Sequence, residues 1–165
     1  MKSKSIFKIA AAMLVFFFAQ NSFAQVARVD TLNEVVIKST SLVNKAVSNA
    51  FKKEFKNPIN PRWYKMDQNY LVMFFAKEQK NNVLYKNNGA LVYHITYMNG
   101  NGLPKEVEGI VNSKYPDYSI LTTFRIEQDA RIIWVVNLKV ANDFVLARVE
   151  DDQLEEIQRF ADISK

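Results

Sequence analysis

The feature that most constrains the fold is a set of strand-like runs in the second half of the chain. In residues 131–140 every even position carries a large apolar side chain: Ile132, Trp134, Val136, Leu138 and Val140. The odd positions mix apolar Ile133 and Val135 with polar Asn137 and Lys139. A period of two is typical of a strand with one face on a core. Two further β-prone runs cover residues 119–127 and 143–149. These runs predict neighbouring strands of an antiparallel sheet.

Two other segments have the period of an amphipathic helix. In the first, apolar residues recur every three or four positions: Val43, Ala46, Val47, Ala50, Phe51 and Phe55. Ser41 is its expected N-cap, and Pro58 ends it. The second segment follows Leu103-Pro104 and ends before Pro116, with Val107, Ile110, Val111 and Tyr115 on one stripe. A third, short helix is expected over residues 152–160.

The stretch between the two helices has strand character from Trp63 to Met98. Asn87-Asn88-Gly89 marks a turn between residues 83–86 and 90–98, which predicts a hairpin. Asn99-Gly100-Asn101-Gly102 interrupts the pattern again and is the best internal boundary.

The two halves of the chain have similar patterns. Four apolar residues of the first helix align with four of the second: Val47, Ala50, Phe51 and Phe55 with Val107, Ile110, Val111 and Tyr115. A strand pair aligns as well, Val83-Leu84 with Val145-Leu146. The alternative is a chance match among hydrophobic residues. The pattern predicts an α+β fold in which two helix-plus-antiparallel-strand repeats, residues 41–100 and 103–165, share one sheet with helices on one face.

The N-terminus has the composition of a secretory signal peptide. Lys2, Lys4 and Lys8 precede or flank an apolar run that is too short to span a membrane, and a small-residue site ends at Ala24. We therefore predict a signal peptide over residues 1–24, an N-terminal extension over 25–40 and one folded domain over 41–165. The location expected is periplasmic or secreted, with no membrane insertion after cleavage. The chain has no cysteine, which argues against a lipoprotein.

Charge and residue types exclude several function classes. Loss of three lysines with residues 1–24 lowers the formal charge from +5 to +2, which does not favour nucleic-acid binding. With one histidine and no cysteine, the chain offers no metal motif, no cofactor motif and no nucleophile-base arrangement. The acidic group of Glu150, Asp151, Asp152, Glu155 and Glu156 is interpreted as the solvated start of a helix. We predict that the chain is not an enzyme.

Several of these residues resemble those of one family. They are Ala50-Phe51 and Phe55 at the end of the first helix, Trp63, Tyr70, Leu103-Pro104 and Tyr115-Pro116. Over residues 41–160 the chain resembles the PepSY-like proteins of the Bacteroidota, which are similar in fold to the β-lactamase inhibitory protein (BLIP). The resemblance implies a binding or inhibitory role without catalysis. The turn after Tyr85 reads Lys-Asn-Asn-Gly where an acidic Asp-x-x-Gly is expected, so no ion site is carried over.

Two shorter resemblances lie near the mature N-terminus. Residues 30–40, DTLNEVVIKST, resemble the segment of outer-membrane receptors that pairs as a strand with TonB. The alternative is an ordinary edge strand. Asp30-Thr31-Leu32 is similar to the O-glycosylation triplet of Bacteroidota, which makes Thr31 a candidate glycosylation site.

The remaining candidate is a mixed surface on the sheet face away from the helices. Matching the parity of the strands predicts six partner-binding residues on this face: His94, Thr96, Thr123, Arg125, Asn137 and Lys139. A surface that combines apolar, polar and cationic groups suits protein docking, although a plain solvated face is the alternative. We expect an unidentified protein partner and possible inhibition of it. The alternatives are a carboxylate-dependent envelope hydrolase and an envelope sensor that contacts TonB through residues 30–40.

Overall fold

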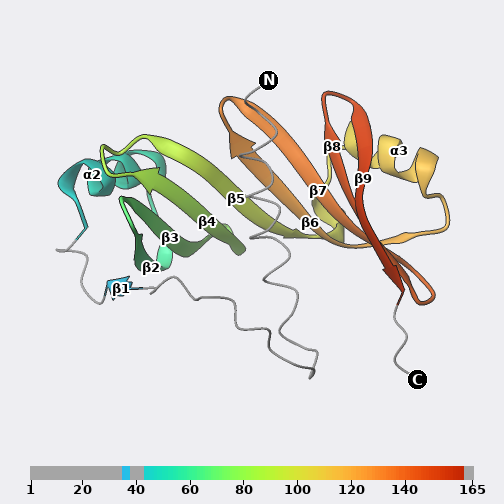
Figure 1. Ribbon diagram of the computed structural model, residues 1–165, viewed down its shortest axis with the longest axis horizontal. Helices are drawn as coiled ribbons and strands as arrows, with labels where there is room; N and C mark the ends of the chain where they lie inside the picture. The colour runs from blue at the N-terminus through green and yellow to red at the C-terminus, as the bar shows by residue number, and fades with distance from the viewer. Residues whose placement is uncertain (1–34, 38–42, 162–165) are drawn as a thin grey trace. The chain divides into compact units, whose positions relative to one another are not determined.

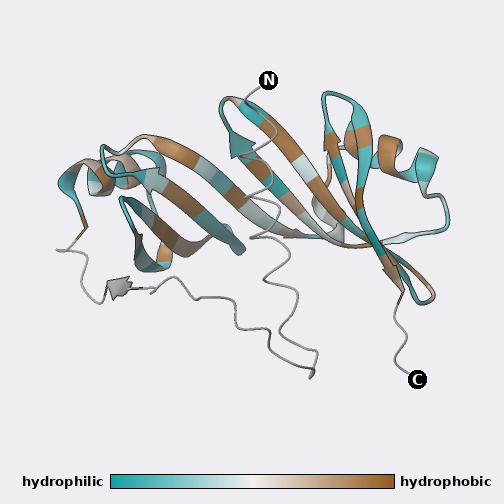
Figure 2. Ribbon diagram, in the orientation of Figure 1, coloured by the Kyte–Doolittle hydropathy of each residue, from teal (hydrophilic) through white to brown (hydrophobic). Residues whose placement is uncertain are grey.

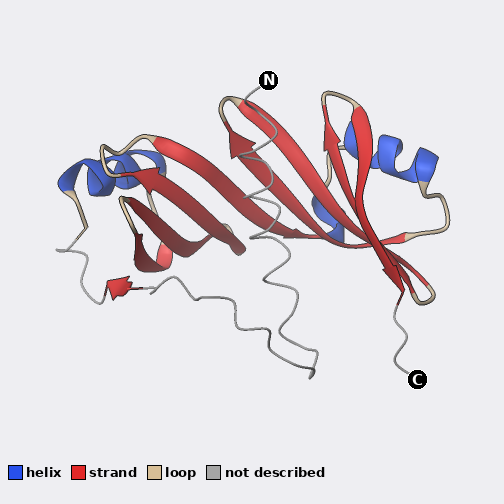
Figure 3. Cartoon of the chain, viewed as in Figure 1, coloured by secondary structure: helices blue, strands red, loops and turns tan. Residues whose placement is uncertain are grey.

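The computed structural model describes residues 35–37 and 43–161, and all of them belong to one unit. Strands make up most of this part of the chain (Figure 3). One antiparallel sheet takes the strands in chain order from β1 to β9. The strands are β1 (Val35–Ile37), β2 (Ile59–Met66), β3 (Asn69–Ala76), β4 (Gln79–Lys86), β5 (Leu91–Asn99), β6 (Ser119–Gln128), β7 (Arg131–Val140), β8 (Asp143–Glu150) and β9 (Gln153–Ala161).

In the described part of the chain, two α-helices interrupt this order (Figure 1). Helix α2 (Lys45–Glu54) precedes β2, and α3 (Lys105–Lys114) lies between β5 and β6, after the short 3-10 helix η3 (Gly100–Gly102). The α2 N-cap is Asn44, whose side chain accepts a hydrogen bond of 2.8 Å from the Ala46 amide. Asn44 therefore fills the role expected of Ser41, which lies outside the described residues.

Most of the hairpin turns have two residues and lack the Asn-Gly or Asp-Gly signal. Three of them have positive φ at both central residues, as a type I′ turn requires: Lys77-Glu78, Asp129-Ala130 and Asp151-Asp152. Gly89 lies in the predicted β4–β5 turn with φ +85°. A Cβ there would stand 2.8 Å from the Ala46 carbonyl oxygen, so this turn packs too closely on α2 for a side chain.

The first core cluster lies between α2 and strands β2–β4. Phe51 is at its centre, with ring centroids at 5.1 Å from Trp63, 5.1 Å from Phe74 and 5.3 Å from Phe55. The other buried members are Val43, Val47, Tyr70, Val72, Val83 and Tyr85. Of the helical stripe read from the sequence, Val43, Val47 and Phe51 are buried and Ala50 and Phe55 are partly buried, whereas Ala46 is exposed.

The second core cluster lies under α3. Val111 and Tyr115 pack there on the buried strand residues Val136, Leu138, Val145, Ala147 and Val149. Trp134 and Val107 are among the partly buried residues that pack against it. Of the even positions of residues 131–140, Val136 and Leu138 belong to this cluster and Trp134 packs against it. Along the strands, Figure 2 shows brown, apolar stretches interrupted by teal, polar ones.

Both clusters occupy the same face of the sheet, because directly paired residues share a face. Val72 of the first cluster pairs with Val83, Val83 with His94, and His94 with Glu127. From β5 the row Thr96, Arg125, Trp134 and Val149 continues into the second cluster. We call this the helix face and the opposite one the helix-free face.

The predicted α+β class is confirmed, while the internal repeat stays a prediction. The short helix expected over residues 152–160 is wrong, because Gln153–Ala161 forms β9, paired with β8. The acidic residues 150–156 therefore belong to a strand hairpin and not to a helix start. The predicted signal peptide over residues 1–24, residues 25–34 with Thr31, and residues 38–42 lie outside the described residues, whereas Val35–Ile37 forms an edge strand.

Candidate protein-interaction surface

Four of the six predicted partner-binding residues lie on the helix face, between the two core clusters. His94 and Thr96 come from β5, and Thr123 and Arg125 come from β6. The expectation that they share a face with Asn137 and Lys139 is wrong. In the β6–β7 register Arg125 pairs with Trp134 and Thr123 with Val136, so odd residues of β6 share a face with even residues of β7.

His94 is the centre of a polar cluster on this face. Its Nε2 lies 2.8 Å from Asn81 Oδ1 and 3.2 Å from Thr96 Oγ1, and its Nδ1 lies 3.3 Å from Glu127 Oε1. The ring of Phe55, which follows α2, meets the imidazole edge to face at 5.3 Å. Arg125 forms an ion pair with Glu127 on the same strand. These contacts explain why polar groups are tolerated between two apolar clusters.

Burial lowers the pKa of His94 below its ordinary value of 6.5. The carboxylates of Glu127 and Glu54 oppose this effect, and Arg125 reinforces it. The histidine is only 9% exposed, and Thr123 is fully buried. These two residues are therefore part of the protein interior and expose little surface to a partner.

Asn137 and Lys139 lie on the helix-free face, where Lys139 joins an aromatic pair. Phe144 of β8 and Phe160 of β9 are directly paired across the strands and stack with centroids 5.3 Å apart and an interplanar angle of 1°. The Lys139 ammonium stands 5.0 Å from the Phe144 ring centroid, within cation–π range. We call Lys139, Phe144 and Phe160 the aromatic patch.

The aromatic patch is accessible to a partner. Phe160 is 47% exposed and Lys139 is exposed, whereas Leu146 beside Asn137 is buried. Sequence reasoning missed Phe144 and Phe160 because the segment of Phe160 was assigned to a helix. Two signals could have identified them. Phe144 alternates with Val145 within one strand, and a second strand follows Asp151-Asp152.

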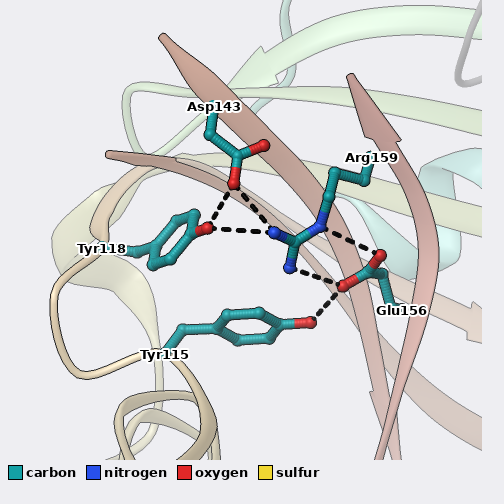
Figure 4. Close-up of polar contacts among 5 residues, drawn as sticks. All are labelled: Tyr115, Tyr118, Asp143, Glu156 and Arg159. Carbon is teal, nitrogen blue, oxygen red and sulfur yellow. Dashed lines mark hydrogen bonds and ion pairs between the residues drawn. The ribbon is translucent and has the colours of Figure 1, made fainter. Parts of the chain in front are cut away.

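A second polar network ties the end of α3 to β8 and β9 (Figure 4). Arg159 donates to Asp143 at 2.9 Å and to Glu156 at 3.0 Å, so one guanidinium bridges two carboxylates. The Tyr115 hydroxyl donates to Glu156 at 2.8 Å, and the Tyr118 hydroxyl donates to Asp143. All five side chains converge in Figure 4, with Arg159 at the centre.

This network favours the charged form of Glu156 and the neutral form of Tyr115. Hydrogen bonds from Arg159 and Tyr115 hold the pKa of Glu156 below its ordinary value. Burial, with the hydrogen bond to Glu156, raises the pKa of Tyr115 to about 12. Since Asp143 and Glu156 are both engaged by Arg159, neither is available as a free general acid or base. The network is a structural clamp between α3 and the end of the sheet.

Within residues 35–37 and 43–161 no group of three or more metal-ligating side chains gathers at one place. None of the described helices has the length and apolar character required to cross a membrane. Among the described acids of the β8–β9 hairpin, Glu150 pairs with Arg131 and Arg148, and Glu155 pairs with Arg148. Glu150 and Glu155 are therefore held in ion pairs with arginines.

No family model matches the chain, and no curated protein matches it. Solved structures do. A DUF2874 family protein from Bacteroides uniformis is 15% identical with a TM-score of 0.58, over 71% of this chain and 88% of its own. A second DUF2874 family protein, from Bacteroides ovatus, is 16% identical with a TM-score of 0.57, over 68% and 86%.

A third structure, a BLIP-like protein from Bacteroides fragilis, is 18% identical with a TM-score of 0.58, over 73% of this chain and 89% of its own. Identities this low show the fold alone. The resemblance to a BLIP-like fold of Bacteroidota, expected from the sequence, is thereby confirmed: the chain has the fold of the DUF2874 and BLIP-like structures of Bacteroides.

Proposed function

We propose that this chain is an exported, non-catalytic protein that binds another envelope or secreted protein through the helix-free face of its sheet. The observation that carries the proposal is the aromatic patch, in which Phe160 is 47% exposed beside Phe144 and Lys139. Contact of an exposed phenyl ring with water is unfavourable, and a partner that buries the ring removes this unfavourable contact. The patch is therefore the part of the helix-free face that we expect to contact the partner first.

The composition of the patch is that of an interface centre. Interface cores are enriched in aromatic residues, and a few well-packed aromatic anchors carry most of the binding energy. Phe144 and Phe160 hold each other in place by stacking, so little side-chain freedom is lost when a partner covers them. Asn137 and Lys139 would add polar contacts at the border. His94, Thr96, Thr123 and Arg125 take no part, because they lie on the other face.

Two further points support a binding role. Glu150, Glu155 and Glu156 of the β8–β9 hairpin are paired with arginines, which argues against the hydrolase alternative. The BLIP-like name of the B. fragilis structure agrees with a binding protein, and inhibition of the partner is part of this proposal. Export to the periplasm or outside rests on residues 1–24. The sensor alternative also remains open, although Val35–Ile37 already pairs with β2.

The proposal is tested by affinity capture from an envelope extract of the source organism, followed by binding measurements on the purified partner. Phe160→Ala should weaken binding by about tenfold or more, as expected for an aromatic anchor. Lys139→Glu should weaken it too, by replacing a cation with an anion at the border of the patch.

Ile132→Ala is the matched control. Ile132 is also 47% exposed, but it lies on the helix face, paired with Glu127. Its truncation should leave the affinity unchanged. Equal weakening by Phe160→Ala and Ile132→Ala, or by neither, would contradict the assignment of the helix-free face.

A further inference from the structure

Strand β9 ends the sheet and leaves one edge open. Among the described strands it pairs only with β8, so within the described part of the chain the backbone groups on its other side have no partner strand. It has nine residues, and all but Leu154 and Ile157 are exposed. An open edge of this length can accept another strand through main-chain hydrogen bonds.

The opposite end of the sheet carries devices that discourage such pairing, and β9 has fewer of them. There β1 has only three residues, and β2 contains Pro61 and a register shift between Ile59 and Arg62. Strand β9, Gln153–Ala161, contains neither proline nor lysine, and its one irregularity is a register shift at Ile157, which has no direct partner on β8. Natural sheets commonly block an edge with proline, lysine or a very short strand.

The order of charges along β9 matches an antiparallel copy of the same strand. Glu156 and Arg159 lie on the helix face, because they pair with Ala147 and Val145 of the second core cluster. An antiparallel pair centred between Ile157 and Gln158 sets Glu156 of one copy opposite Arg159 of the other, twice by symmetry. Opposite charges in directly opposed positions stabilise a sheet.

The same register keeps residues of one face opposite each other, because the irregularity at Ile157 places Glu156 and Arg159 on the same face although they are three residues apart. It sets Leu154 opposite Ala161, and both residues lie on the helix face through their partners Val149 and Asp143. On the other face it brings Glu155 of one copy opposite Phe160 of the next. A register shifted by one residue would oppose residues from different faces, which a continuous sheet does not allow.

We propose that two copies of this chain associate through their β9 edges, antiparallel and centred between Ile157 and Gln158. The contact is isologous, with the same strand on both sides, as in most symmetric dimers. It joins the two sheets into one and puts the two aromatic patches on the same face. The dimer does not rest on the proposed function, but it would present that binding surface twice.

The first test is the oligomeric state of the chain after export, measured by sedimentation over a concentration series. The wild-type chain should form dimers. Arg159→Glu leaves acids as the only charged residues of the contact, and it sets two acids opposite each other in both symmetry-related pairs. It should therefore raise the dimer dissociation constant about tenfold or more. Arg62→Glu makes the same charge change on exposed β2 and should leave the dimer intact.

Charge exchange separates a broken contact from a broken fold. A chain with Glu156→Arg should also fail to form dimers alone, and its mixture with the Arg159→Glu chain should form heterodimers. Both chains lose ion pairs that Arg159 makes within one copy with Asp143 or Glu156, so circular dichroism must show that each is folded.

Cysteine cross-linking tests the register without touching any charge, since the chain has no cysteine of its own. A mixture of the Leu154→Cys and Ala161→Cys chains should form an intermolecular disulfide under mild oxidation, because directly opposed residues lie within disulfide distance. Either chain alone should not, and neither should a mixture of Arg62→Cys with Ala161→Cys. A wild-type chain that stays monomeric at all concentrations, or dimers whose mixed cysteine variants do not cross-link, would overturn the proposal.

Discussion

Truncation of Phe51 should be among the most damaging changes to the folded chain. Phe51 is 5% exposed, and its ring is within 5.1–5.3 Å of the rings of Phe55, Trp63 and Phe74. Phe51→Ala removes the side chain on which α2 packs against β2 and β3. We expect the free energy of unfolding to fall by about 3–5 kcal/mol, the range for buried phenylalanines that leave a cavity.

Equilibrium unfolding in urea measures this loss, with far-UV circular dichroism as the readout. Phe75→Ala is the control, because Phe75 lies on β3 next to Phe74 but is 46% exposed. It should cost about 1 kcal/mol or less, as surface substitutions do. If the two variants lost equal stability, the assignment of the first core cluster to the interface of α2 with the sheet would be refuted.

Two more predictions concern polar residues. The pKa of His94 is lower in the folded chain than in the unfolded chain, so the unfolded chain takes up the proton first as the pH falls. The contribution of neutral His94 to the free energy of unfolding is therefore complete above about pH 6.5 and is lost below it. Urea unfolding at several pH values should show this loss, which His94→Gln should abolish; a gain at acidic pH would mean that Glu127 outweighs burial. Asn44→Ala removes the α2 N-cap and should cost about 1 kcal/mol in the same assay, whereas Asn49→Ala on the exposed side of α2 should cost nothing.

The strands were predictable where alternation is strong. The run 131–140 coincides with β7, and the bounds of β6 and β8 differ from the expected ones by a single residue each. Turn chemistry contributed little, because pairs such as Lys77-Glu78 and Asp129-Ala130 adopt positive φ without glycine. The alternation within each strand, more than any turn motif, made these segments recognisable.

Strand β9 could not be predicted because its local pattern is helical. Leu154 and Ile157 are three residues apart among Glu and Gln, which favour helix. Tertiary contacts override this preference: the Asp151-Asp152 turn pairs the segment with β8, and Glu156 and Arg159 bind Tyr115 and Asp143. Since Phe160 belongs to β9, the same error hid the aromatic patch.

Of the aromatic patch only Lys139 was predicted, because the sequence does not show how neighbouring strands are paired. Alternation identifies which residues of one strand share a face, but the register between strands decides which faces combine. The two-residue turn at Asp129-Ala130 pairs Gln128 with Arg131, so Arg125 lies beside Trp134 and not beside Asn137. Without that register, parity carried from β6 to β7 gave the wrong face to His94, Thr96, Thr123 and Arg125.

The most direct test of the central claim is a cysteine-labelling footprint of the chain in complex with its captured partner. Phe160→Cys and Ile132→Cys replace side chains of equal exposure on opposite faces, in a chain with no other cysteine. Binding through the helix-free face predicts that the partner protects the thiol of Phe160→Cys from a labelling reagent. The thiol of Ile132→Cys should stay as reactive as in the free chain. Protection at position 132 with free labelling at position 160 would contradict the claim.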